Sequence, residues 1–587
     1  MSADPKVLLT DLLQTALKSV APELAATPIL LERPKQASHG DFATNLALQL
    51  AKPLKRNPRE LAGLLLAELP PSKLVARAEV AGAGFINFTL AADAKTAVVR
   101  EVLAKGADFG RGAGKGIKVQ VEFVSANPTG PLHVGHGRGA AYGASLSDVL
   151  AFAGYEVSRE YYVNDAGRQM DILALSTWLR YLAFFGIEIP FPPNAYQGDY
   201  VVDMGREMRD AHQDRFAKVT AMQILAGTPG LAPSDRKDDE AKQQREEHLD
   251  ALIANAKKLL GEDYPWVHGF ALNEQLGDGR EDLQEFGVRF DKWFSEQSLF
   301  DTGLVERAVI QLEKAGHIYL QDGAKWFRST AFGDEKDRVV QRENGLFTYF
   351  ASDIAYHLNK YERGFDRMID IWGADHHGYI PRVKGAIAAL GLDPARLDVA
   401  LVQFAVLYRD GQKTSMSTRS GEFVTLRELR REVGNDACRF FYVLRKSDQH
   451  LDFDLDLAKS QSNENPVYYV QYAHARVCSV LDQWGGEAAE LAGADLGLLQ
   501  NERELALCAR LASFAELVQD AAAGYAPHQI AFYLKDLAAD FHSWYNAERM
   551  LVEDEALKLA RLALAAAVRQ VLVTGLKMLG VSAPESM

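Results

Sequence analysis

Residues 117–163 constrain the fold of this chain more than any other stretch, because they contain one complete strand–turn–helix–strand unit. A valine-rich strand, IKVQVEFVS at 117–125, comes first. A polar turn with two prolines and a helical pattern through Phe152 follow, and a second strand, YEVSREYYV, begins after Gly154. Two strands joined through a helix lie parallel. The unit therefore predicts a Rossmann-type, doubly wound parallel sheet that begins here.

The pattern on either side of this unit predicts two further domains. Up to about residue 110, helical stretches alternate with short strands, and from about 425 to the end the pattern is almost wholly helical. A glycine-rich linker, GRGAGKG, separates the first part from the sheet. We expect a small N-terminal α/β domain at 1–110, a Rossmann-type domain at 111–425 with an insertion at about 190–285, and a C-terminal helical bundle at 426–587.

Composition places the protein among cytoplasmic proteins rather than membrane or secreted ones. No basic N-terminal start precedes an apolar run, and no stretch of about 18 uninterrupted apolar residues occurs. The three cysteines lie far apart, which disfavours a zinc site and a disulfide framework. We therefore expect a cytoplasmic protein with no membrane partner and no bound metal of its own.

Charge is distributed unevenly along the chain. The net charge is −14, but residues 1–115 hold 15 Lys and Arg against 11 Asp and Glu, a balance of +4. The remainder holds 50 against 68, a balance of −18. The sum argues against nonspecific coating of nucleic acid, while the basic N-terminal part permits a local site for an anionic partner.

The turn after the first strand, SANPTGPLHVGHGRGAAYG at 125–143, contains two histidines separated by Val-Gly. A metal pair would prefer a spacing of four on a formed helix and a third ligand nearby. A dinucleotide fingerprint would need its first glycine directly after the strand, and two prolines intervene here. A third interpretation places both imidazoles where a helix begins, which favours phosphate oxygens, with glycines that allow a nucleotide to approach. His133 and His136 would then stabilise the charge that develops during attack at an α-phosphate.

Four segments now carry a resemblance to class I aminoacyl-tRNA synthetases. PLHVGH at 131–136 resembles the HIGH signature, and WGADHH at 372–377 resembles the loop that receives the adenosine ribose. GQKTSMSTRSG at 411–421 resembles the KMSKS loop, and LRELRREVGNDACRFFYVLR at 426–445 resembles the entry to the anticodon-binding domain of the arginine branch. In this family resemblance the ATP-binding residues are Pro131, Leu132, Gly135, Gly137, Gly373, Asp375, His376, Met416 and Ser417.

The arginine branch can be tested against the chemistry of its substrate. A guanidinium group has five donors in a plane and requires a carboxylate with neighbouring acceptors. Tyr349 and Asp353 stand four residues apart, so they share one face of a helix, and the pair resembles the family's side-chain pocket. Ser125 and Asn127 match positions that hold the polar end of the amino acid, with Glu122 as a further helper. Asp165 and Gln169 follow the second strand. They either line this site or cap the next helix.

One segment departs from the family pattern. Ser415 and Thr418 stand where the KMSKS signature has lysines. Departure of pyrophosphate still requires cations, from side chains or from Mg²⁺. Lys413 and Arg419 flank the segment and are our catalytic candidates beside the histidine pair.

Recognition of RNA rests on weaker signals. Cations in the N-terminal part lie near groups suited to unpaired bases, and aromatic residues at 465–480 could stack on an anticodon. Each patch could equally belong to a solvated or packed helix. The resemblance favours RNA binding by an N-terminal α/β RNA-binding domain and by the helical domain, through Phe42, Asn45, Lys55, Arg56, Tyr469, Tyr472 and Arg476.

The resemblance implies activation of L-arginine by ATP and its transfer to tRNA(Arg), in a monomer that uses Mg²⁺. No covalent enzyme intermediate is needed, because positioning and charge stabilisation suffice. Two alternatives stay open. The first is another class I synthetase: the lack of zinc-spaced cysteines disfavours a cysteinyl enzyme, and Asp353 would repel the acidic substrate of a glutamyl enzyme. The second is a catalytically inert RNA-binding relative, which only the altered KMSKS segment favours.

Overall fold

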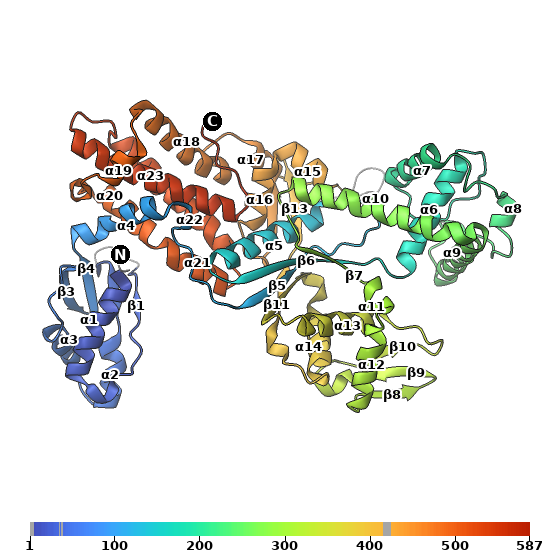
Figure 1. The fold of residues 1–587 in the computed structure, drawn as a ribbon, viewed down its shortest axis with the longest axis horizontal. Coiled ribbons are helices and arrows are strands. Elements are labelled where there is room, and N and C mark those ends of the chain that lie inside the picture. The colour runs from blue at the N-terminus through green and yellow to red at the C-terminus, as the bar shows by residue number, and fades with distance from the viewer. Residues whose placement is uncertain (1–4, 35, 37–38, 415–423) are drawn as a thin grey trace.

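The computed structural model describes residues 5–587 except 35, 37–38 and 415–423. Figure 1 shows an elongated molecule with a parallel sheet at its centre. An N-terminal unit and a helical domain lie toward one end, and two inserted lobes lie toward the other. The sheet thus lies between the N-terminal unit and helical domain on one side and the two inserted lobes on the other.

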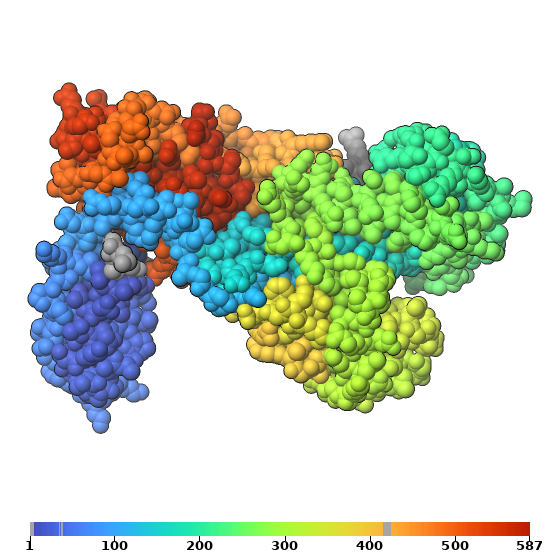
Figure 2. All heavy atoms as spheres, in the orientation of Figure 1, coloured from blue at the N-terminus to red at the C-terminus, as the bar shows by residue number. Residues whose placement is uncertain are grey.

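The N-terminal unit packs three helices on a four-stranded antiparallel sheet with the order β1-β2-β4-β3. Its own core contains Leu13, Leu50 and Phe88. Figure 2 shows this unit as a separate lobe that meets the rest of the molecule at a narrow junction. Its elements are α1 (Pro5–Val20), β1 (Leu31–Glu32), β2 (Phe42–Thr44), α2 (Leu46–Leu54), α3 (Pro58–Ala67), β3 (Val75–Ala81) and β4 (Phe85–Leu90).

The central sheet is parallel throughout, with the order β12-β11-β5-β6-β7. Side chains alternate between its faces, as the strand period requires. Tyr161 lies in the core on the side of α5, and Tyr162 lies in the core on the side of α13. The elements are β5 (Lys118–Glu122), α5 (Val134–Phe152), β6 (Glu156–Val163), β7 (Lys292–Ser295), α13 (Tyr349–Glu362), β11 (Arg367–Gly373), α14 (Ile380–Ala389) and β12 (Leu397–Val402).

A helical lobe is inserted between β6 and β7, over the range in which the sequence pattern breaks. The highly charged helix of the lobe, α9, is exposed along one face but buries Leu249, Leu252 and Ile253 on the other. The last helix, α10, returns from the lobe to the sheet (Figure 1). The lobe consists of α6 (Arg168–Ala183), α7 (Asp199–His212), α8 (Ala221–Ile224), α9 (Asp239–Leu260) and α10 (Tyr264–Glu285).

A second, smaller lobe lies between β7 and α13. It contains a three-stranded antiparallel sheet with the order β10-β9-β8, which packs beside α12 and α13. Its elements are α11 (Gln297–Asp301), α12 (Leu304–Lys314), β8 (Ile318–Gln321), β9 (Ala324–Phe327) and β10 (Arg338–Gln341).

After the central sheet the chain forms a small three-stranded sheet, β14-β13-β15, before the helical domain begins. The segment from 425 is almost wholly helical, as predicted, with one exception: β15 (Leu451–Asp454) pairs in parallel with β13 (Ala405–Arg409). The other elements here are β14 (Gln412–Lys413), α15 (Leu426–Val433), α16 (Asn435–Val443) and α17 (Leu455–Lys459).

The helical domain packs around its last helix. That helix, α23, is the single helix in the described residues that is long and apolar enough to cross a membrane. Its most apolar 18-residue stretch is 78% buried inside the protein. α4 (Ala92–Lys105) joins the domain from the N-terminal side and contacts α20 and α23. The domain consists of α18 (Pro466–Trp484), α19 (Ala488–Ala492), α20 (Glu502–Ala512), α21 (Phe514–Ala523), α22 (His528–Ala547) and α23 (Glu555–Met578).

Candidate active site

The carboxyl ends of β5 and β11 define the position of the candidate site. From β5 the chain passes through α5 to β6 on one side, and β11 pairs with β5 on the other. Strand order therefore reverses between β5 and β11, and ligands of such sheets bind outside the strand ends at this switch point. The histidine turn follows β5, and the loop with Asp375 follows β11.

The two histidines form a reciprocal cap at the start of α5. His133 is the N-cap, and its Nδ1 accepts a hydrogen bond from the Gly135 N–H at 3.1 Å. His136 is the third helical residue, and its Nδ1 accepts from the His133 N–H at 3.2 Å. The ring centroids lie 3.7 Å apart. The pair therefore satisfies two backbone donors that a helix N-terminus leaves open.

This arrangement fixes the protonation of both rings. Burial lowers the pKa of His133, and burial together with His133 lowers the pKa of His136 to about 3. Both imidazoles are accordingly neutral at pH 7. Because each Nδ1 accepts a backbone hydrogen bond, each proton resides on Nε2. The turn thus combines two neutral N–H donors with the positive end of a helix.

Aromatic and acidic groups surround the histidine turn at the strand ends. Phe404 follows β12 and is 49% exposed. A methyl group placed on Gly135 would lie 3.4 Å from Cδ1 of the Phe404 ring, so this ring lies against the turn. On the adjacent strand end, a methyl group on Gly373 would lie 2.5 Å from Oδ1 of Asp375. Gly373 therefore leaves room for the Asp375 carboxylate, which is exposed beside His376.

The histidine turn is bound by main chain to the segment that precedes α15. The Val134 N–H donates to the Val424 carbonyl at 3.0 Å, and the Leu426 N–H donates to the Leu132 carbonyl at 2.8 Å. Thr425, between these bonds, caps α15. The HIGH-like turn is therefore joined directly to residues 424–426, which follow the KMSKS-like segment.

Two expectations for ATP contact are wrong. The Leu132 side chain lies in the hydrophobic core, so it has no surface to offer a nucleotide. Gly137 is buried, and a methyl group there would lie 2.8 Å from the hydroxyl of Tyr442. The lack of a side chain at 137 serves packing against α16 instead. Pro131 is partly exposed beside the turn.

Of the candidates in and around the KMSKS-like segment, the structure describes only Lys413. Lys413 is exposed on β14. Met416, Ser417 and Arg419 lie outside the described residues.

The backbone after β5 is strained in the segment that we expect to hold the amino acid. Val124 and Ser125 have φ values of 67° and 43°, where residues with side chains cost about 1–3 kcal/mol each. The Ser125 hydroxyl donates to Glu122 at 3.0 Å and accepts from the Tyr162 N–H at 3.1 Å, which holds the turn in place. Asn127, two residues on, is exposed. The strain and its fixation mark a functional constraint at this strand end.

Tyr349 and Asp353 extend from the first turns of α13 as expected. Tyr349 is 62% exposed, and its hydroxyl would lie 3.4 Å from a methyl group on Gly167. Asp353 is partly buried and accepts a short hydrogen bond from the Tyr379 hydroxyl. Burial raises the pKa of Asp353, with the Tyr379 bond opposing the rise.

Glu296 is a second acid at this place, and sequence reasoning missed it. It follows β7, is buried, and its Oε1 accepts from the Ser352 hydroxyl at 2.9 Å. Burial, with Asp353 nearby, raises the pKa of Glu296 to about 7. Among the described residues, neither Glu296 nor Asp353 forms a salt bridge. A glutamate directly after a short strand was the only signal in the sequence.

The helix-capping interpretation of Asp165 applies to an unexpected helix. Its Oδ1 accepts from the Gln297 N–H at 2.9 Å, at the start of α11 rather than of α6. This bond keeps the carboxylate close enough to Glu296 to contribute to its raised pKa. Gln169 is exposed in the first turn of α6.

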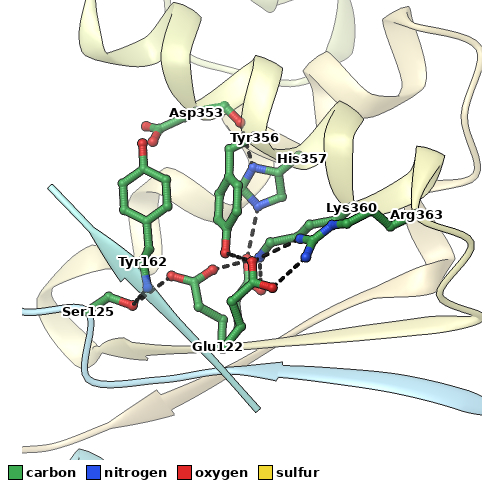
Figure 3. A network of polar contacts seen from close by, with 10 residues as sticks. Glu122, Ser125, Tyr162, Asp353, Tyr356, His357, Lys360 and Arg363 are labelled. Carbon is green, nitrogen blue, oxygen red and sulfur yellow. Dashed lines mark hydrogen bonds and ion pairs between the residues drawn. The ribbon is translucent and has the colours of Figure 1, made fainter. Parts of the chain in front are cut away.

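Buried ion pairs support this pocket from below (Figure 3). Lys360 donates from Nζ to Glu122 and to Asp370, each at 2.6 Å, and His357 bonds Asp370 at 2.9 Å. Although burial opposes it, Lys360 with the His357 bond lowers the pKa of Asp370 to about 2. α13 therefore presents Asp353 to the pocket and Lys360 to the strands beneath.

The RNA-binding candidates lie on two separate surfaces, with one correction. Phe42 is 1% exposed in the core of the N-terminal unit, with Arg33 4.7 Å above its ring, so the expectation that it stacks on a base is wrong. Asn45 accepts from the Gln49 side chain at 2.6 Å, while Lys55 and Arg56 are exposed after α2.

The aromatic candidates of the helical domain form a mixed cluster on α18. The Arg476 guanidinium lies 4.4 Å from the centre of the Tyr472 ring. His542 lies 4.6 Å from the Tyr469 ring and 5.7 Å from the Tyr472 ring. All three α18 candidates are partly buried, so each keeps a face toward solvent.

Comparison with known proteins assigns the family. Three family models match in succession: an arginyl tRNA synthetase N-terminal domain at 8–90, the catalytic domain of class I (R) tRNA synthetases at 98–181 and 279–450, and a DALR anticodon-binding domain at 470–587. The arginine–tRNA ligases of Azoarcus sp. and Dechloromonas aromatica are 87% and 72% identical, each over the full length of both chains. The arginyl-tRNA synthetase of Thermus thermophilus is 25% identical with a TM-score of 0.72 over 99% of both chains. These matches show that the chain belongs to the arginyl-tRNA synthetases, the arginine–tRNA ligases of class I, and the histidine cap and the two neighbouring carboxylates agree with them.

Proposed function

We propose that this chain activates L-arginine and charges tRNA(Arg) in two steps. A carboxylate oxygen of arginine attacks the α-phosphorus of ATP, the bond to the β-phosphate oxygen breaks, and pyrophosphate leaves arginyl adenylate. A ribose hydroxyl at the 3′ end of the tRNA then attacks the arginyl carbonyl carbon, loses its proton and displaces AMP. Neither step requires a covalent bond to the enzyme.

One observation carries the proposal: Glu296 is bonded to Ser352, the neighbour of Asp353, so the two carboxylates lie close together, and no described residue forms a salt bridge with either. Two buried carboxylates close together disfavour joint ionisation unless a cation joins them. A guanidinium supplies that charge, and its planar donors fit several acceptors at once. Tyr349, Asp165 and Gln169 would complete the rim, and Ser125 and Asn127 would hold the polar end of the substrate.

The ATP half of the site would use the histidine turn and the neighbouring strand ends. The Nε2–H groups of His133 and His136 would donate to phosphate oxygens, with the N-terminus of α5 adding its dipole. Asp375 would accept from ribose hydroxyls with Gly373 leaving space, and Phe404 would pack against the base above Gly135. Mg²⁺ would enter as MgATP, as part of the substrate, and Lys413 and Arg419 would offset charge on pyrophosphate.

The variant Asp353→Asn tests the proposed arginine pocket. Asparagine keeps the shape but removes the charge, so we expect kcat/KM for arginine to fall by about 100-fold, the equivalent of about 3 kcal/mol for a buried charge pair. KM for ATP should change by less than about twofold. The measurement is steady-state aminoacylation with each substrate varied in turn.

Asp393→Asn is the matched control. Asp393 accepts from the Ala395 N–H at 2.9 Å in an exposed turn, and asparagine caps such turns equally well. Its kinetics should equal those of the parent. Equal arginine kinetics in the Asp353 variant would instead place the guanidinium elsewhere.

Charging assays with each amino acid separate the remaining alternatives. Attachment of arginine alone to tRNA(Arg) supports the proposal, and attachment of another amino acid would indicate a different specificity. A lack of charging by pure, folded protein with ATP and tRNA(Arg) would indicate an inert relative.

The remaining parts of the proposal concern partners and location. tRNA(Arg) would contact Asn45, Lys55 and Arg56 on the N-terminal unit and Tyr469, Tyr472 and Arg476 on α18. The protein would act as a monomer in the cytoplasm. Sedimentation equilibrium at micromolar concentration tests the monomer, for which 64.8 kDa is the expected mass.

A further inference from the structure

Arg138 is a buried arginine on the helix that begins with the histidine turn, and it forms no salt bridge with any carboxylate among the described residues. It is 1% exposed and lies two residues after His136 on α5. Burial lowers the pKa of Arg138 to about 10. Taking a permanent cation out of water is expensive, so its contacts have to compensate for that cost.

Those contacts are backbone carbonyls from two loops. One guanidinium nitrogen, Nη1, donates to the Gln403 carbonyl at 2.8 Å and to the Gln449 carbonyl at 2.7 Å. The other, Nη2, donates to the Lys446 carbonyl at 3.0 Å. The Gln403 N–H also donates to the Ser447 carbonyl at 2.9 Å. Arg138 therefore fastens α5 to the loop after β12 and to the loop after α16.

The loop after β12 leads directly to the ATP half of the site. Phe404 comes next after Gln403, is half exposed, and has its ring against Gly135 in the histidine turn. The distance between the histidine cap and the Phe404 ring is thus set by α5 on one side and by the Gln403 carbonyl on the other. Arg138 is the side chain that connects these two sides.

We propose that Arg138 is a positioning residue for ATP, which acts by holding the loop of Gln403 and Phe404 at a fixed distance from the histidine pair. This inference rests on the proposed placement of the nucleotide base on Phe404. It adds a determinant of ATP affinity that touches neither substrate. The arginine pocket, formed by α13 and the ends of β6 and β7, does not share these contacts, so KM for arginine should be independent of Arg138.

The chain contains a matched control in Arg439. It is 0% exposed, its pKa is likewise lowered to about 10 by burial, and its Nε donates to the Leu579 carbonyl at 3.0 Å. Its other contacts are the Phe286 carbonyl and the Ser145 hydroxyl, each at 3.4 Å. Arg439 thus joins α5 to α10 and α23 with the same kind of bonds, away from Phe404.

The test compares Arg138→Lys with Arg439→Lys in the full-length protein. A lysine cannot reproduce the planar fork, so both variants should melt at a lower temperature than the parent. Only Arg138→Lys should raise KM for ATP, by about tenfold, as expected when a binding group is displaced by a fraction of an ångström. KM for arginine should stay within about twofold in both. An unchanged KM for ATP in Arg138→Lys, or an equal rise in Arg439→Lys, would overturn the inference.

Two further variants keep the test decisive. Phe404→Leu examines the proposed base site itself. If it leaves KM for ATP unchanged, the placement of the base is wrong. If it raises KM while Arg138→Lys does not, only the positioning role is wrong. Should Arg138→Lys fail to fold, Arg138→Gln takes its place, because its neutral amide removes the buried charge and cannot reach both loops with the guanidinium fork. A raised KM for ATP is expected, and an unchanged one overturns the inference.

Discussion

Two carboxylates in the arginine pocket differ in what their surroundings do to them. Asp353 is bonded to the Tyr379 hydroxyl, whereas Glu296 is bonded to Ser352 and faces Asp353 and Asp165 as nearby charges. Burial, together with these two charges, raises the pKa of Glu296 to about 7. A substrate cation has to be matched by the ionised form of this acid.

We therefore expect the affinity for arginine to rise with pH through about 7. Below that value Glu296 is protonated in the free enzyme, so each lower pH unit should raise KM for arginine by up to about tenfold, with a plateau above pH 8. The guanidinium of the substrate stays charged throughout. Measurement of KM for arginine from pH 6 to pH 8 checks this expectation.

Glu296→Gln serves as the control, because glutamine does not titrate. Its KM should be nearly independent of pH and should exceed that of the parent at pH 8 by about tenfold or more, as for loss of a hydrogen bond to a charge. A parent enzyme with a flat profile would show that Glu296 does not meet the guanidinium.

At this scale the sequence predicts chemistry where the motif is local and fails where packing decides. The histidine pair and the Tyr349–Asp353 spacing lie within single segments, so their helical placement follows from the pattern. Glu296 was not predicted as part of this site because the whole inserted lobe and β7 separate it from Asp165 along the chain. Phe42 was misassigned because an aromatic residue in a short strand has the same pattern whether it faces solvent or the core.

At the scale of elements, α13 is the helix on which the site depends. One of its faces presents Asp353, His357 and Lys360 at successive turns, and the strands below answer with Glu122 and Asp370 (Figure 3). Buried pairs of this kind contribute little compared with an apolar core, but their disruption is costly. The helix is therefore held in one register over β5 and β11.

Lys360→Met should destabilise the central domain by about 3–5 kcal/mol, because it leaves the Glu122 and Asp370 carboxylates buried without their cation. The comparison is Lys105→Met, which removes an exposed ion pair with Glu101 on α4 and should cost less than about 1 kcal/mol. Melting temperatures followed by fluorescence check both values. Equal, small shifts for the two variants would mean that the buried pair adds nothing to the fold.

The pattern of strands and helices around β5 could be predicted because each element shows its own period. The helical lobe could be located but not described, since its charged helix hides an apolar face. The three-stranded sheet β8–β10 went unrecognised because its strands are only four residues long. Strands that short carry too little alternation to be distinguished from loops.

At the scale of the whole molecule, the N-terminal unit stands apart with its own core and a narrow junction (Figure 2). Across that junction Arg33 donates to the Ala512 carbonyl at 3.3 Å, and Lys6 pairs with Glu516. Such a small junction makes the unit separable from the sheet that binds the small substrates.

Deletion of residues 1–90 should therefore leave KM for ATP and for arginine within about twofold, while KM for tRNA(Arg) should rise by about tenfold or more. In the full-length chain, the double variant Lys55→Ala/Arg56→Ala should show part of this rise, and its difference from the parent should shrink at higher salt, because the parent loses more counterion-release affinity. Aminoacylation with tRNA varied checks both. An unaltered KM for tRNA in the deleted chain would mean that this lobe does not contact the nucleic acid.

Two main-chain hydrogen bonds join the histidine turn to residues 424–426, and the side chain of Leu426 packs beside Gly137 on α5. These contacts are made by residues that follow the segment 411–421. Substitutions within 411–421 can thus alter the charges offered to ATP without breaking the hydrogen bonds between residues 424–426 and the histidine turn. This chain, with Ser415 and Thr418 in place of two lysines, still forms the hydrogen bonds between the histidine turn and residues 424–426. The residue types within 411–421 can therefore change while the hydrogen bonds between the histidine turn and residues 424–426 remain.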